Sequence, residues 1–124
     1  MMYSLAVALG GALGAVSRYW LIGAVSAASN HRFPWGTLAV NVIGSLLIGM
    51  MYVLISERMA LSEQWRAVLI VGYLGAFTTF STFSLDALLL AQEGFLLQAL
   101  AYIVSSVLIC LLCAWLGIAL MRAL

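Results

Sequence analysis

The segment GYLGAFTTFSTFS, residues 72–84, decides the fold, because it lies within a long apolar stretch yet suits an unbroken helix poorly. Glycine loses backbone entropy in a helix, and Ser and Thr hydroxyls compete for the hydrogen bonds of its backbone. We therefore predict that a spanning helix breaks near residues 75–79, at mid-membrane depth. The alternative is a continuous helix whose hydroxyls bond back to the preceding turn.

Three more apolar stretches accompany this one. The composition is 66% hydrophobic and only 7% charged, whereas soluble domains carry about 25% charged residues. A spanning helix needs ~20 mostly apolar residues, and four segments reach that length. We predict an all-α integral membrane protein with one transmembrane domain over residues 1–124 and four transmembrane helices, at approximately 3–27, 36–55, 67–90 and 95–121.

A break inside the membrane must be buried in protein or line a cavity, because its backbone groups lack helical partners. The carbonyl end of the first half-helix is electronegative and suits a small cation. Phe80 and Phe83 follow the break and, three residues apart, project from one face. Their ring edges are positive and suit a small desolvated anion. The alternative role of both rings is packing.

Uncharged polar residues form a stripe at helical spacing on each of two other segments. The two stripes are Thr37, Asn41 and Ser45 on the second, and Tyr102, Ser106 and Cys110 on the fourth. Interhelical hydrogen bonding is the usual use of such side chains. The functional alternative is a track of donors for an ion that has lost part of its water shell.

One arginine, Arg18, lies well inside the first apolar stretch. A charge inside a membrane is costly and points to function or to a buried partner. Arg18 either reaches an aqueous vestibule, where it would attract anions, or pairs with Asp86 of the third segment. The sequence leaves both alternatives open.

The arginines give only a weak orientation signal. With four spans, one side of the membrane carries Arg58, Arg66 and Arg122, while the other carries Arg32 and, if it reaches the interface, Arg18. Such a small bias permits insertion both ways, and opposite orientations can form an antiparallel dimer. One bundle of four helices has a filled interior, so transport predicts an oligomer.

Several other classes are disfavoured. The near-neutral charge gives no basic stripe for a nucleic-acid partner. His31 lies in a loop, and no nucleophile–base pair is visible, so we predict no enzyme activity. Cys110 and Cys113 form a CxxC pair, but without further Cys or a nearby His they are interpreted as small core residues.

Three motifs together resemble a known family. GGALGAVSRY (10–19), WGTLAVNVIGSLLIG (35–49) and GYLGAFTTFSTFS (72–84) are similar to the signatures of the Fluc fluoride channels, also called CrcB-type proteins. The resemblance covers the four-helix layout, and the TTFSTF segment is its most specific part. It implies a passive, fluoride-selective channel that exports fluoride across the bacterial inner membrane, assembled as an antiparallel dual-topology homodimer with two pores.

The resemblance also implies roles for individual residues. Phe80 and Phe83 would be the pore phenylalanines and Asn41 a polar pore residue, while the carbonyls of Gly75 and Thr78 would bind a structural sodium ion (Na+) at the dimer centre. Near-pore hydroxyls would be Thr37, Ser81, Thr82, Tyr102 and Ser106, and Arg18 would lie near a vestibule. One departure is Cys110, a weak donor where the track usually continues with a hydroxyl.

The strongest rival is a proton-coupled small multidrug transporter, which is also short and four-spanning. Such an exchanger needs a carboxylate in its first helix, and the first span here has none. Coupling sites in membranes are ionisable, and Asp86 in the third span is the one acid expected within a membrane segment. A structural subunit without transport is the third alternative.

Overall fold

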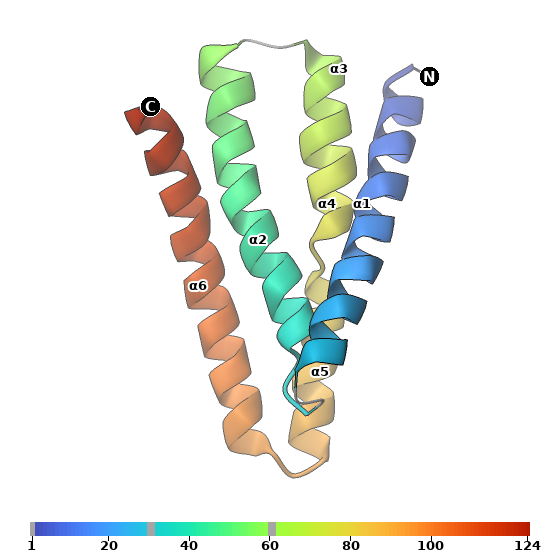
Figure 1. Cartoon of the computed structure of the whole chain (residues 1–124), viewed down its shortest axis with the longest axis vertical. Helices are drawn as coiled ribbons and strands as arrows, with labels where there is room; N and C mark the ends of the chain where they lie inside the picture. Colours follow the sequence, from blue (N-terminus) through green and yellow to red (C-terminus); the bar gives the residue numbers. More distant parts are fainter. Residues whose placement is uncertain (1, 30–31, 60–61) are drawn as a thin grey trace.

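The computed structural model describes residues 2–29, 32–59 and 62–124, which form helices joined by short connections and contain no strand (Figure 1). The predicted loop residue His31 lies outside the described residues. In chain order the elements are α1 (Met2–Ala28), α2 (Trp35–Tyr52), η1 (Val53–Arg58), α3 (Glu63–Arg66), η2 (Ala67–Leu74), α4 (Gly75–Phe77), α5 (Phe80–Gln92) and α6 (Leu96–Ala123).

Four helical stretches are long and apolar enough to cross a membrane. They are Tyr3–Ala28, Trp35–Arg58, Glu63–Gln92 and Leu96–Ala123. Each exceeds the ~20 residues that a bilayer core requires, and the described residues add no other element of comparable length. The prediction of an all-helical, multi-pass membrane protein with four spans is confirmed.

The four spans form two closely packed pairs (Figure 1). The first pair is α1 with the η2–α4 stretch, and the second is α2 with α6. Small residues permit the second contact, because a Cβ on Gly49 would collide with the Ala114 carbonyl oxygen, and one on Gly117 with that of Leu46. Close approach of this kind is the usual basis of helix association in membranes.

Within the third span, two residues with extended backbone separate α4 from α5. Thr78 has φ −83° and ψ 159°, and Thr79 has φ −151° and ψ 117°. Thr79 also caps α5, since its Oγ1 accepts a hydrogen bond from the Thr82 amide at 3.2 Å. We call this two-residue segment the Thr78–Thr79 link; it is visible as a thin connection above α5 (Figure 1).

The stretch before α4, η2, is π-helical. π-Helical turns are rare and are frequent at functional sites. The remaining core lies where α5 meets α6, around Phe83, Leu90 and Tyr102. This cluster fixes the rotation of α5 after the link, and therefore fixes the direction in which its first residues project.

Candidate functional site

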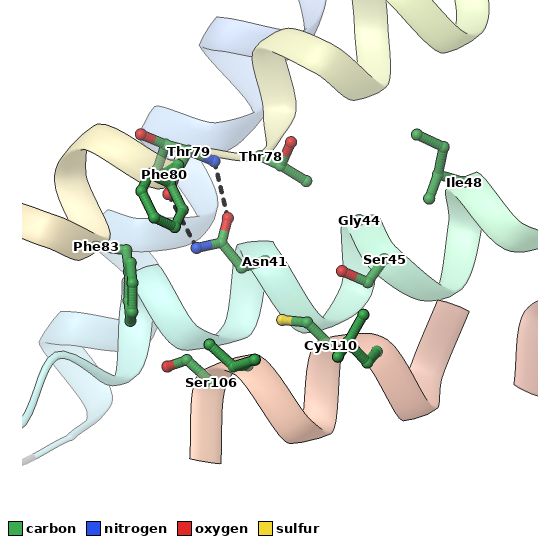
Figure 2. A pocket seen from close by; sticks show the side chains of 12 residues that line it. Asn41, Gly44, Ser45, Ile48, Thr78, Thr79, Phe80, Phe83, Ser106 and Cys110 are labelled. Carbon is green, nitrogen blue, oxygen red and sulfur yellow. Dashed lines mark hydrogen bonds between the residues drawn. The ribbon is translucent and has the colours of Figure 1, made fainter. Parts of the chain in front are cut away.

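The candidate site is a pocket of about 380 Å³ between α2, α6 and the Thr78–Thr79 link with the start of α5 (Figure 2). No acidic or basic side chain lines it. The twelve lining residues are Asn41, Gly44, Ser45, Ile48, Thr78, Thr79, Phe80, Phe83, Ser106, Val107, Cys110 and Leu111. Both polar stripes seen in the sequence therefore meet the third span at one place.

Asn41 is held by the backbone of the link through two hydrogen bonds. Its Nδ2 donates to the Thr79 carbonyl at 3.0 Å, and the Thr79 amide donates to its Oδ1 at 2.8 Å (Figure 2). Backbone groups freed at membrane depth need partners, and one side chain supplies both partners here. An amide NH2 has two donors, so one Asn41 hydrogen is left for another acceptor.

The two phenylalanines lie together but differ in exposure. Their ring centroids are 5.3 Å apart at 47°. Phe83 is 8% exposed and packs 5.2 Å from the Tyr102 ring, whereas Phe80 is 77% exposed. Phe83 is therefore fixed in the wall of the pocket, and Phe80 projects from its edge with most of its ring uncovered.

Ser106 contributes a buried hydroxyl to the pocket. The residue is 5% exposed, and its Oγ makes no hydrogen bond to any described residue. Buried polar groups are seldom left unpaired, because the lost hydrogen bond costs about 1–3 kcal/mol. The Ser106 hydroxyl therefore lacks a hydrogen-bond partner among the described residues, which a ligand in the pocket could supply.

Asp86 joins the two stripes outside the pocket. Its Oδ2 accepts from the Thr37 hydroxyl at 2.7 Å and from the Tyr102 hydroxyl at 3.5 Å. Thr37 and Tyr102 are both buried. Sequence reasoning treated Asp86 as a possible partner of Arg18 and missed this cluster. The available signal was the position of Asp86 three residues after Phe83, on the same face of the helix.

Arg18 does not pair with Asp86. Its Nη1 donates instead to the Thr78 carbonyl at 3.3 Å, and the ion pair found within residues 2–29, 32–59 and 62–124 is Arg122 with Glu57, at the exposed end of α6. Of the two alternatives for Arg18, pairing with Asp86 is therefore wrong. The vestibule role stays a prediction.

The remaining hydroxyls predicted near the pore lie beside the pocket. Thr79 Oγ1 donates to Thr82 Oγ1 at 3.1 Å and is 3.3 Å from Ser81 Oγ. These contacts organise the first turn of α5. The structure thus brings Asn41, Phe80, Phe83 and Ser106 together in the pocket wall, whereas Thr37, Ser81, Thr82 and Tyr102 are not among the residues that line it.

The carbonyls at the end of α4 have the chemistry expected of a cation site. The Thr79 amide, which would bond to the Gly75 carbonyl in a continuous helix, donates to Asn41 instead. Carbonyl oxygens at a helix end are electronegative, and the Thr78 carbonyl already accepts from a guanidinium. Two carbonyls are fewer oxygens than the shell of a hard cation requires, so Gly75 and Thr78 of one chain do not by themselves form a complete cation site.

Comparison with known proteins agrees with this architecture. A family model described as "CrcB-like protein, Camphor Resistance (CrcB)" matches residues 5–118. The chain belongs to this family. The matched range begins in α1 and ends in α6, so it includes all four spans of the CrcB-family fold described above.

Curated relatives carry a common name. A "Fluoride-specific ion channel FluC" of Hahella chejuensis is 54% identical over 116 residues, which cover 94% of this chain and 91% of that protein. One of Magnetococcus marinus is 52% identical over 112 residues, 90% of this chain and 91% of the relative. One of Methylococcus capsulatus is 47% identical over 96% of this chain but only 52% of its own length, so the chain spans about half of that relative. These CrcB-family relatives are named as channels, in agreement with the prediction that the chain is not an enzyme.

Proposed function

We propose that this chain forms a fluoride-selective channel that passively exports fluoride across the bacterial inner membrane and thereby lowers cytoplasmic fluoride. The observation that carries the proposal is the uncharged pocket in which an amide, hydroxyls and two phenylalanine rings meet. The names of relatives about half identical to this chain support fluoride as the ion.

The pocket chemistry suits a small anion that has lost its water. The Ser106 hydroxyl and the second Nδ2 hydrogen of Asn41 are donors without a protein acceptor among the described residues. The rings of Phe80 and Phe83 add positive edges. Conduction requires that an ion leave as readily as it enters, and a pocket without a fixed positive charge meets that requirement.

A second copy, inserted in the opposite orientation, completes the pathway. In one chain the pocket is open at Phe80, whose ring is 77% exposed. In an antiparallel homodimer each copy would cover the open edge of the other copy's pocket. The dimer would then contain two pores, one for each pocket. The arginines are divided three against one or two between the two sides of the membrane, a bias weak enough to permit both orientations.

Hydroxyl groups outside the pocket would extend the pathway of the ion. Thr37 and Tyr102 lie on α2 and α6 beyond Asn41 and Ser106, and both are directed by Asp86. Ser81 and Thr82 support the start of α5, where Phe80 begins. Arg18, beside the link, would attract anions toward a vestibule.

A sodium ion at the dimer centre would hold the two links together. The carbonyls of Gly75 and Thr78 from each copy would supply oxygen ligands, which hard cations prefer. The support for this site is the donor lost from the Gly75 carbonyl, since the Thr79 amide bonds to Asn41 instead. The ion would have a structural role and would not be transported.

Purified protein in liposomes tests the proposal. Vesicles loaded with fluoride should release it down its gradient, with a matching electrical current and without a proton gradient, while chloride is retained. Release that depends strictly on a counter-flow of protons would indicate an exchanger, and inertness toward all small ions would indicate a structural subunit. Either result would overturn the channel assignment.

A further inference from the structure

Cys110 is an unusual residue for this pocket, because every other polar lining group is a hydroxyl or an amide. A thiol is a weak hydrogen-bond donor but a strong ligand for soft metals. The Cys110 side chain is partly exposed and lines the pocket from α6 (Figure 2). Cys113, three residues later, is also a free thiol but is absent from the pocket wall.

A second observation points to a ligand beside this thiol. Ser106 lies one helical turn before Cys110, so the two side chains share a face of α6. The Ser106 Oγ is buried and has no hydrogen-bond partner among the described residues. Ser45 of α2 faces the same space from the opposite wall (Figure 2). A species bound to the sulfur would therefore lie in a pocket that also contains these two hydroxyl groups.

We propose that Cys110 is a modification site at which mercuric chloride, as a representative soft-metal halide, binds covalently and blocks the pore. The reaction is R–SH + HgCl2 → R–S–HgCl + H+ + Cl−, in which the S–H bond and one Hg–Cl bond break and an S–Hg bond forms. No electrons are transferred, and the proton and chloride leave to water.

The chemistry of the pocket favours a neutral reagent over a free cation. The lining residues carry no acid to attract a metal ion, and HgCl2 enters an apolar pocket as an intact, uncharged molecule. Once attached, the S–HgCl group occupies part of the pocket that Cys110 lines and removes the S–H donor. Anions would then lose both space and donors at this point.

The chain supplies its own matched control in Cys113. Fluoride efflux from liposomes is measured before and after HgCl2 for the wild type, Cys110→Ser and Cys113→Ser, and each rate is compared with that variant's own untreated rate. We expect efflux of the wild type and of Cys113→Ser to fall below about one tenth, with recovery on adding excess thiol, whereas Cys110→Ser keeps its rate. Block of Cys110→Ser, or protection by Cys113→Ser, would overturn the proposal.

The block itself rests on the proposed channel function, so binding is measured separately by intact mass. The Cys113→Ser variant should gain one mercury adduct, and the Cys110→Ser/Cys113→Ser double variant should gain none. If no variant releases fluoride before treatment, the channel function fails, while the adduct still decides whether Cys110 is a metal-reactive site. Absence of the adduct in Cys113→Ser rejects the site whatever the fluxes show.

Discussion

Asn41 and Thr79 form a closed pair in which one side-chain amide satisfies both backbone groups of one residue. The Asn41 Nδ2 donates to the Thr79 carbonyl at 3.0 Å, and the Thr79 amide donates to Asn41 Oδ1 at 2.8 Å. Thr79 is buried, so water cannot replace these bonds. The extended backbone of the Thr78–Thr79 link therefore depends on a residue of α2, 38 positions earlier.

Replacing Asn41 by Ala should destabilise the protein as well as slow fluoride release. Two buried backbone groups would lose their partners, at about 1–3 kcal/mol each. Thermal unfolding in detergent measures the loss, with Ser45→Ala as control, since Ser45 lines the same pocket but its side chain pairs with Cys110 of α6 and not with the link. If Asn41→Ala and Ser45→Ala melt at the same temperature, Asn41 does not support the link.

Replacing Phe80 by Ile should reduce fluoride flux by about tenfold, which corresponds to a loss of ~1.4 kcal/mol in anion stabilisation. An aliphatic side chain has no positive ring edge. Efflux from liposomes measures the flux, and size-exclusion chromatography checks that the oligomer is retained. Leu88→Ile is the control, because Leu88 is also exposed on α5 and lies away from the pocket. Equal flux in both variants would remove the ring-edge role.

Sodium should stabilise the assembled protein. A ligand that binds only the folded dimer adds about 2.7 kcal/mol at one hundred times its dissociation constant. Melting in detergent is compared between sodium chloride and the chloride of a large organic cation at equal ionic strength. Identical melting curves would leave the Gly75 and Thr78 carbonyls without a metal to bind.

The spans were predictable from the sequence, but the partners of the polar residues were not. Four stretches of apolar residues are long enough to be recognised as spans. The glycine- and threonine-rich segment predicts a break in the third span. Which donor meets which acceptor depends on helix rotation and register. The periodicity placed Thr37 and Asn41 on one face of the second helix. It could not show that the Thr37 hydroxyl donates to the Asp86 carboxylate while the Asn41 amide donates to the Thr79 carbonyl.

Arg18 shows the same limit. Its charge inside the first span left two alternatives open, an aqueous vestibule and a carboxylate partner. The guanidinium instead donates to the Thr78 carbonyl, which exists as an acceptor only because the link leaves the helix. A backbone carbonyl is present at every residue, so the residue types do not indicate which carbonyl of another span will be free to accept from Arg18.

Thr37 and Asp86 should be energetically coupled. A hydrogen bond to a charged group contributes about 1.5–3 kcal/mol, and the Thr37 hydroxyl lies 2.7 Å from Asp86 Oδ2. A double-mutant cycle with Thr37→Val and Asp86→Ala, followed by unfolding in detergent, measures the coupling. Repeating the cycle with Ser84→Ala in place of Thr37→Val gives the control, because residues two apart on a helix do not face each other. Additive effects in the Thr37 cycle would contradict the contact.

Gly49→Ala should separate α2 from α6 and lower stability by about 1–3 kcal/mol, the usual cost of overpacking. The new Cβ would collide with the Ala114 carbonyl oxygen, which is backbone and cannot move aside as a flexible side chain would. Gly23→Ala is the matched control, since a Cβ there meets no atom within 4 Å among the described residues. Because α6 carries Ser106 and α2 carries Asn41, widening this contact should also slow fluoride release. Melting and efflux that match those of Gly23→Ala would show that close approach of these helices does not hold the pocket together.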